Sequence, residues 1–218
     1  MSYAIKEIFY TLQGEGANAG RAAVFLRFAG CNLWTGLQED RNRGPGGCSR
    51  WCDTDFVGTD GPGGGRFTSA AEVVEAVQRH WAPARDARQG RKPFVVCTGG
   101  EPLLQLDEPL LARFNSEGWL VAVETNGTID PPAGKLWLTV SPKANAPLRL
   151  LEGNELKLVY PQEGAEPERY EGLAFGHFFL QPMDGPNLAQ NTARTVEYCL
   201  RHPNWRLSLQ THKIVGIP

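Results

Sequence analysis

The chain has 218 residues, with 22 lysines and arginines, 24 aspartates and glutamates, and a formal net charge of −2. This length suits one large domain, which can bury roughly 70% of its unfolded surface without disulfide support. The near balance of charge creates no overall field for nucleic acid or an acidic membrane surface, so we expect neither as a direct partner.

The N-terminal residues MSYAIKEIFYTLQGEG contain no uninterrupted apolar segment and no small-residue cleavage site, so they do not resemble a secretory signal. No part of the sequence approaches the roughly 18 apolar residues of a membrane-spanning helix. We therefore expect a cytoplasmic protein without a membrane partner. In the cytoplasm disulfides are rare, and clustered cysteines more often bind metals or carry out redox chemistry.

Short apolar runs predict buried strands, because most of them are too short and too continuously apolar for surface helices. Each run ends abruptly in a polar motif or in one that contains Gly or Pro. The expected strands are Ala22–Phe28, Phe94–Cys97, Trp119–Val123, Leu136–Val140, Glu155–Tyr160, His177–Leu180 and Trp205–Leu209.

Three segments between these strands have helical patterns. A capping box at Ser69–Glu72 begins the first helix, whose apolar residues then share one helical face. The second, Asp107–Glu117, ends before Gly118, and the third, Thr192–Arg201, ends before Pro203. The expected apolar face of the first helix consists of Val73, Val74, Val77 and Trp81.

The alternation of strands and helices predicts βαβ units, and therefore a parallel sheet with right-handed crossovers. The connections after Val123 and Val140 are too short or too rich in proline for full helices. We therefore predict an α/β fold, an incomplete TIM-like barrel with reduced helix content. Residues 1–218 are expected to form a single domain. Gly58–Arg66 is expected to be a flexible loop, without the glycine pattern of a phosphate cradle.

Polar motifs follow six of the expected strands. In a parallel sheet these motifs all lie at the carboxyl edge, where α/β folds place their active sites. We therefore expect one site formed by all six. The motifs are Ala29–Cys31, Thr98–Pro102, Glu124–Gly127, Ser141–Lys143, Gln181–Asp184 and Gln210–Lys213.

Three of the five cysteines lie in the polar segment 31–52. Sixteen residues separate Cys31 from Cys48, and three separate Cys48 from Cys52. Three thiolates are one ligand short of a closed structural zinc site, although a histidine or a distant cysteine could complete it. An iron–sulfur cluster held by three thiolates would instead leave one iron open for a ligand.

The cysteine segment, together with Thr98–Gly99–Gly100–Glu101–Pro102 after the next strand, resembles the radical S-adenosylmethionine enzymes. In that superfamily three cysteines hold a [4Fe–4S] cluster, and its open iron binds the amino and carboxylate groups of the cofactor's methionine part. A Gly-Gly-Glu segment helps to bind that amino group, because glycine lets the backbone approach closely.

A narrower resemblance, to the 7-carboxy-7-deazaguanine synthase family, covers nearly the whole chain. That family has a long gap after its first cysteine and then CxxC, whereas this chain has one additional residue before Cys52, an insertion that a loop usually absorbs. The motifs that carry the resemblance are Leu12–Gly16, Arg27–Trp34, Cys52–Phe56, Val96–Pro102, Ser141–Lys143, Gln181–Pro186 and Gln210–Lys213.

The resemblance implies roles for individual positions. Cys31, Cys48 and Cys52 would hold the cluster, and Thr54 would bind Mg²⁺, which prefers hard oxygen ligands. Residues implied at the substrate are Leu12, Gln13, Gly14, Arg27, Thr98 and the terminal carboxylate of Pro218, and the predicted strand ends add Glu15 and His212 to this group. Residues implied at S-adenosylmethionine are Trp51, Cys52, Asp53, Gly100, Ser141, Pro142, Lys143, Gln181, Pro182, Met183 and Asp184, and the predicted strand ends add Glu101, Glu124 and Asn126 to this group.

The implied activity is a carbon–nitrogen lyase reaction, the contraction of 6-carboxy-5,6,7,8-tetrahydropterin to 7-carboxy-7-deazaguanine with loss of ammonia. It belongs to the biosynthesis of queuosine and other 7-deazapurines. The substrate's carboxylate suits Arg27, and its guanidine-like edge suits hydrogen-bond acceptors. The resemblance also implies an electron donor such as flavodoxin, a homodimer and a cytoplasmic location.

Two other functions use some of the same residues. A glycyl-radical activating enzyme would share the cluster and the cofactor but act on a protein. A non-catalytic binding module would use the three cysteines for zinc. Arg27 could also have a purely structural role, in an ion pair with Glu15. Five further residues are not expected to have a functional role. Cys97 and Cys199 are expected to be core thiols, and His80, His177 and His202 are expected to be structural or to lie at the surface.

Overall fold

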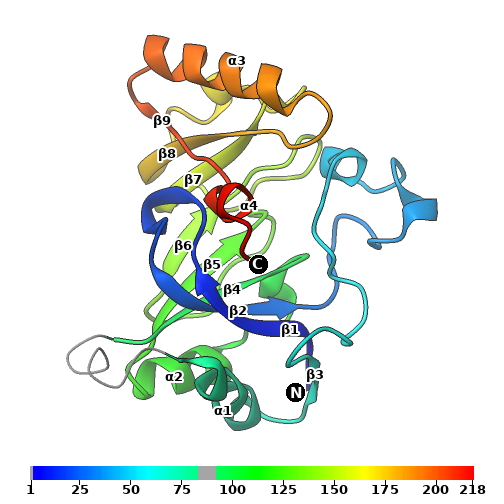
Figure 1. The fold of residues 1–218 in the computed structure, drawn as a ribbon, viewed down its shortest axis with the longest axis vertical. Coiled ribbons are helices and arrows are strands. Elements are labelled where there is room, and N and C mark those ends of the chain that lie inside the picture. Colours follow the sequence, from blue (N-terminus) through cyan, green and yellow to red (C-terminus); the bar gives the residue numbers. More distant parts are fainter. Residues whose placement is uncertain (1, 83–91) are drawn as a thin grey trace.

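A computed structural model describes residues 2–82 and 92–218 of the chain (Figure 1). Within these residues, nine strands form one sheet in the spatial order β3-β1-β2-β4-β5-β6-β7-β8-β9. The strands are β1 Tyr3–Leu12, β2 Ala22–Phe28, β3 Gly65–Phe67, β4 Phe94–Gly99, β5 Leu120–Thr125, β6 Trp137–Val140, β7 Glu152–Tyr160, β8 Ala174–Pro182 and β9 Trp205–Leu207.

The strands from β2 to β9 in this order pair in parallel, which confirms the predicted parallel sheet. Every expected strand is present, with its ends displaced by a few residues at most. The connections after β5 and β6 contain no helix, as their composition predicts. Because β3 and β9 lie at opposite edges, the sheet is open.

Two strands are not evident from apolar runs. β1 pairs antiparallel with β2, and β3 pairs antiparallel with β1. The segment of β1 contains Lys6 and Glu7, which interrupt its apolar pattern. The expectation of a loop over Gly58–Arg66 is wrong at its end, because pairing with β1 places Gly65 and Arg66 in β3.

The helices begin and end close to their sequence signals. The Ser69 hydroxyl accepts the Glu72 backbone N–H at α1, and Asp107 accepts the Leu110 N–H at α2. The predicted third helix begins one turn earlier than expected, at Leu188. The helices are α1 Ala70–His80, α2 Glu108–Ser116, α3 Leu188–Arg201 and α4 Thr211–Val215, and short 3-10 turns cover Gly16–Asn18, Gln38–Asp40, Gly47–Arg50, Pro102–Leu104 and Pro167–Arg169.

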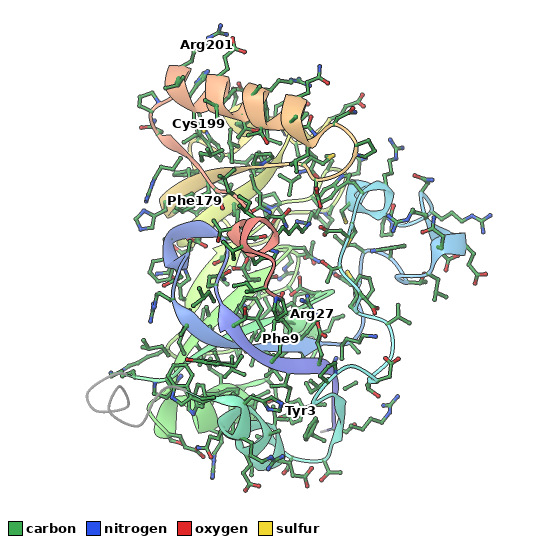
Figure 2. All side chains as sticks on the ribbon, viewed as in Figure 1. Tyr3, Phe9, Arg27, Phe179, Cys199 and Arg201 are labelled. Carbon is green, nitrogen blue, oxygen red and sulfur yellow. The ribbon has the colours of Figure 1, made fainter. Side chains whose placement is uncertain are left out.

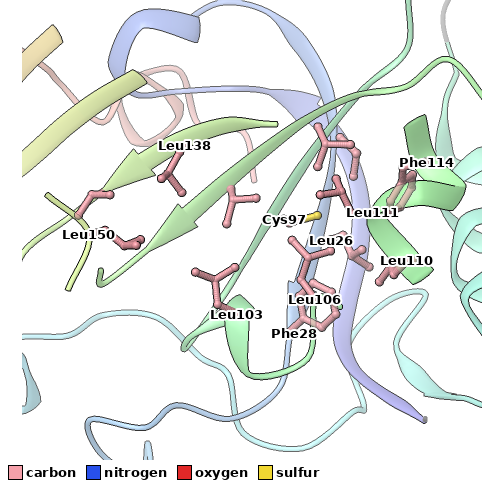
Figure 3. Close-up of a cluster of buried hydrophobic side chains, with 14 of the residues drawn as sticks. Leu26, Phe28, Cys97, Leu103, Leu106, Leu110, Leu111, Phe114, Leu138 and Leu150 are labelled. Atoms are coloured by element: carbon pink, nitrogen blue, oxygen red, sulfur yellow. The ribbon is translucent and has the colours of Figure 1, made fainter. Parts of the chain in front are cut away.

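The main core lies between the sheet and its helices. α1 and α2 lie together at one end of the molecule, and α3 covers β8 and β9 at the other (Figure 1). In Figure 3, Leu110 and Leu111 of α2 lie beside Leu26 and Cys97 of the sheet. Cys97 is fully buried and therefore a core thiol, as predicted.

The other residues expected to be structural occupy such positions. Cys199 of α3 is partly buried against the core, whereas Arg201 projects outward (Figure 2). His80 contacts the carbonyl of its own helix, and His177 and His202 stack on aromatic rings. In the described part of the chain, no helix is both long and apolar enough to span a bilayer.

We expect Leu111→Ala to lower the free energy of unfolding by about 3 kcal/mol, because truncating a fully buried leucine leaves a cavity. Urea denaturation followed by circular dichroism measures this loss. Leu200→Ala is the control, since Leu200 is 81% exposed, and its effect should stay within about 0.5 kcal/mol. Equal losses in the two variants would contradict the assignment of the core.

Candidate functional site

Two adjoining cavities open at the carboxyl edge of the parallel strands. The first has a volume of about 280 Å³, and the second about 180 Å³. The motifs that follow the strands contribute to one or both of them, as their positions predict. The residues that line both cavities, and therefore form a shared wall, are Glu15, Asp53, Thr54, Thr98, Glu124 and Gln210.

Three unpaired thiols line the second cavity, which we call the thiol cavity: Cys31, Cys48 and Cys52. Burial raises the pKa of the Cys31 thiol, and it raises that of Cys48 to about 11, so metal binding has to displace their protons. The backbone N–H of Leu33 donates to Cys31 Sγ at 3.4 Å, a contact that favours a thiolate. Among the described residues, no three His, Cys, Asp or Glu side chains already converge on one metal position.

Gly100 brings the backbone close to the thiols. A Cβ at this position would lie 2.3 Å from the carbonyl oxygen of Gly30 and 2.6 Å from the Cβ of Cys31. Both distances are far below van der Waals contact, so no side chain fits here. The glycine therefore lets the backbone after β4 pack directly against the Cys31 segment, and Gly100 also lines the thiol cavity.

Hydrogen-bonding groups complete the thiol cavity. Lys143 Nζ lies 2.5 Å from Ser141 Oγ and 5.5 Å from the centre of the Trp51 ring. Burial lowers the pKa of Lys143. Asn126 and Gln181 also line this cavity. Its polar groups therefore surround the three thiols, as a charged cofactor requires.

Arg27 lies in the first cavity, which we call the arginine cavity, beside Phe9 (Figure 2). The Arg27 Nε–H donates to Glu7 Oε1 at 2.7 Å, across the antiparallel pair of β1 and β2. The alternative that Arg27 pairs with Glu15 is therefore wrong, because strand register places Glu7 opposite it. The other predicted substrate residues along this cavity are Leu12, Gln13, Glu15, Thr98, His212 and Pro218.

The C-terminal segment closes one side of the arginine cavity. Thr11 Oγ1 donates to the Pro218 carbonyl oxygen at 2.8 Å, and Thr211 Oγ1 donates to Gly14 O at 2.9 Å. Gly14 itself lies under His212, where a Cβ would come within 2.2 Å of the imidazole Nδ1. The small residue thus lets the C-terminal helix pack against the loop after β1.

The shared wall contains a buried ion cluster. Lys157 Nζ donates to Glu15 Oε2 at 2.6 Å and to Glu124 Oε2 at 2.7 Å. Burial would raise the pKa of Glu15, but Lys157 and the amide of Gln210 outweigh it and lower the value to about 2. Burial raises the pKa of Glu124, and Lys157 opposes that rise.

Glu101 lies beneath the cavities and lines neither. Its carboxylate is fully buried and accepts hydrogen bonds from Thr125 Oγ1 and from the backbone N–H groups of Leu103 and Asn126. These contacts tie the end of β4 to the end of β5. The other predicted residues that line neither cavity are Gly14, Pro142, Pro182, Met183 and Asp184.

Two of the predicted cofactor residues are instead joined by the C-terminal helix. Lys213 Nζ lies 2.5 Å from both Asp53 Oδ2 and Asp184 Oδ2. The ion pairs connect the cysteine segment and the end of β8 with α4. Because Asp184 pairs with Lys213, its carboxylate helps to close the site and is not free to contact a ligand.

Sequence patterns missed several residues of the site. Lys157 lies in a segment that we expected to be an apolar strand. Glu155 and Lys157 occupy alternate positions of this strand and therefore point to the same face of the sheet, and this spacing could have indicated a polar face. Glu7 belongs to a strand that the apolar runs did not predict. Two aromatic residues of the cavity walls, Phe9 and Phe25, lie in none of the motifs, and Trp34 and Phe56 lie in motifs but had no predicted role.

The fold and site define an α/β protein with a cysteine-lined ligand cavity beside a second, arginine-containing cavity. No protein-family model matches the chain. Over its full length, however, the chain is 59% identical to the 7-carboxy-7-deazaguanine synthase of Bordetella pertussis and 58% identical to that of Bradyrhizobium diazoefficiens, with each relative also covered completely. The chain belongs to the 7-carboxy-7-deazaguanine synthase family.

A solved structure agrees with this assignment. The crystal structure of QueE from Escherichia coli superposes with a TM-score of 0.68 and 27% sequence identity. The match covers 96% of this chain and 94% of the other. The α/β fold with its mainly parallel sheet is therefore shared along almost the whole chain.

We expect Glu15→Gln to flatten the loss of stability in acid. A carboxylate whose pKa falls from 4.5 to about 2 on folding stabilises the protein above pH 4.5, and this stabilisation disappears as the pH falls towards 2. Urea unfolding of the metal-free protein between pH 5 and 2.5 measures the slope. An unchanged slope in Glu15→Gln would contradict the ion pair with Lys157.

Proposed function

We propose that this chain converts 6-carboxy-5,6,7,8-tetrahydropterin to 7-carboxy-7-deazaguanine with loss of ammonia, as a radical S-adenosylmethionine lyase. The observation that carries the proposal is the shared wall between a cavity with three free thiols and a cavity with Arg27. A reactive cofactor and its substrate can thus lie side by side. Full-length identity to proteins that bear the synthase name supports the same conclusion.

The arginine cavity suits the proposed substrate. Arg27 would bind the pterin carboxylate through a charge-assisted hydrogen bond, while its Nε–H remains on Glu7. The guanidine-like edge of the pterin presents N–H donors, which the terminal carboxylate of Pro218 and the carboxylates of the shared wall can accept. Gln13, Thr98 and the backbone of Leu12 would complete the contacts.

The thiol cavity suits a [4Fe–4S] cluster. Cys31, Cys48 and Cys52 would hold three irons, and the cavity that they line together with Gly100 would take a ligand of the fourth. When bound, the reduced cluster supplies the electron that cleaves S-adenosylmethionine to start radical chemistry. Trp51, Asn126, Ser141, Lys143 and Gln181 would orient the cofactor and exclude water.

Several finer features belong to the same proposal. Thr54 of the shared wall would provide a hydroxyl ligand to Mg²⁺ beside the substrate carboxylate. The open sheet would act as an incomplete TIM-like barrel within a single domain of residues 1–218. Electrons would come from a donor such as flavodoxin, and the enzyme would be a cytoplasmic homodimer.

The arginine cavity also separates the proposal from its rivals. A glycyl-radical activating enzyme acts on a protein and gives no purpose to Gln13, Arg27 and the C-terminal residues that close this cavity. A zinc-binding module has no need for a second polar cavity beside its cysteines. Membership of the synthase family favours neither alternative.

The first test is the product assay under strict anaerobiosis. Protein reconstituted with iron and sulfide, then reduced with dithionite, should convert the pterin to the deazapurine and release ammonia. Arg27→Gln should raise the KM for the pterin about 10- to 100-fold, because it removes a charge-assisted hydrogen bond. Cofactor cleavage without deazapurine in the unaltered protein would overturn the proposed function.

Arg21→Gln is the matched control for Arg27→Gln. Arg21 directly precedes β2, and its guanidinium lies over the ring of Phe94, outside both cavities. Its removal should leave the KM within about twofold, the scatter of surface substitutions. If both arginine variants raised the KM equally, Arg27 would not be the group that recognises the carboxylate.

Cluster assembly provides a second prediction. Cys31→Ala, Cys48→Ala and Cys52→Ala should each retain little iron and lose the broad visible absorption of the reconstituted protein, because three thiolates are needed to hold the cluster. Cys199→Ala is the control, since this thiol belongs to α3, packs against the main core and lines neither cavity. Bound stoichiometric zinc and a colourless protein after reconstitution would instead support the binding module.

A further inference from the structure

Lys157 lies on β7, next to two residues of the shared wall. Its side chain is 5% exposed and contacts one oxygen of each of two carboxylates, Glu15 and Glu124. These carboxylates come from different elements, the loop after β1 and the end of β5. A single ammonium group therefore joins two segments that each contribute a carboxylate to the lining of both cavities.

The remaining carboxylate oxygens are also held. Glu15 Oε1 accepts the Nε2–H groups of Gln181 and Gln210, at 3.2 and 3.0 Å. Glu124 Oε1 accepts Gln13 Nε2–H at 3.2 Å. Each carboxylate oxygen has two acceptor positions, so both groups keep acceptor capacity for a ligand in the arginine cavity.

The charges around this cluster do not balance without Lys157. Glu124 faces Glu15 and also Glu155, which lies two residues before Lys157 on the same strand. Glu15 faces His212 of α4 as well, but burial lowers the pKa of that imidazole, so it is mainly neutral near pH 7. Lys143, a second ammonium group near Lys157, hydrogen-bonds to Ser141. Removal of Lys157 would therefore leave close, buried carboxylates without the cation that pairs with them, a state in which one of them takes up a proton.

We infer that Lys157 is a positioning residue for the substrate, which keeps Glu15 and Glu124 ionised and aimed at the N–H donors of the pterin's guanidine-like edge. This inference rests on the proposed function. It assigns the wall carboxylates to the substrate and gives Lys157, which carries no recognised motif, the task of holding them. Because Lys157 lines only the thiol cavity, it acts through them and not by direct contact in the arginine cavity.

Lys157→Met tests the inference. The KM for the pterin should rise about 10- to 100-fold, the cost of losing a hydrogen bond to a charged acceptor. The acidic limb of kcat/KM should also move to higher pH, because the carboxylates then gain protons more readily. Lys157→Arg, which keeps the positive charge, should restore the position of that limb.

Two further variants separate this role from general stability. Lys6 is also a buried lysine with two carboxylate partners, Asp55 and Asp60, but it does not line either cavity. Lys6→Met should leave the pH profile in place even where it lowers the melting temperature. The charge-compensated double variant Lys157→Met/Glu124→Gln covers the case in which Lys157→Met does not fold, and it should bind the pterin more weakly in anaerobic equilibrium dialysis.

Three results would overturn the inference. The first is an unchanged KM and pH profile in Lys157→Met. The second is loss of S-adenosylmethionine binding with full pterin affinity, which would place the lysine's role at the cofactor. The third is unaltered pterin affinity in the double variant. Failure of the proposed function differs from all of these, because the unaltered protein would then form no deazapurine.

Discussion

The structure depends on the burial of charged groups where parallel strands end. A buried charged group needs hydrogen-bond or ion-pair partners. Glu101, beneath the site, accepts hydrogen bonds from the hydroxyl of Thr125 and from two backbone N–H groups. Lys157 pairs with two glutamates of the shared wall. Since an unpaired buried charge costs several kcal/mol, these contacts fix the strand ends relative to one another.

The cysteine segment is organised by its own contacts as well as by a ligand. Arg41, in the long gap between the first two cysteines, donates to the carbonyl oxygen of Cys52 at 3.2 Å and lies over the Trp34 ring. Gly47 N–H donates to the carbonyl of Ala144 at 2.7 Å, which joins the segment to the loop after β6. The sixteen-residue gap thus contains groups that shape the thiol cavity, and all three thiols line this cavity despite the additional residue before Cys52.

The C-terminal residues connect the two ends of the fold at the site. Thr11 and Gly14 of the N-terminal segment bind Pro218 and Thr211, while Lys213 joins the cysteine segment to β8. Pro218 and the residues of α4 thereby complete one side of the arginine cavity. These hydrogen bonds and ion pairs hold α4 in place, although none of the residues of this short helix is buried.

The sequence by itself determined the parallel strands, their helices and the polar motifs at the carboxyl edge, because periodicity, caps and strand-ending residues are local signals. Three cysteines in a polar segment likewise predicted a metal-binding cavity. Only the tertiary structure decided that β1 and β3 join the sheet, that Arg27 pairs with Glu7, and that Lys157 bridges two glutamates. These contacts join residues that are far apart in the chain or that are brought together by strand register. Such contacts produce no periodic pattern in the sequence.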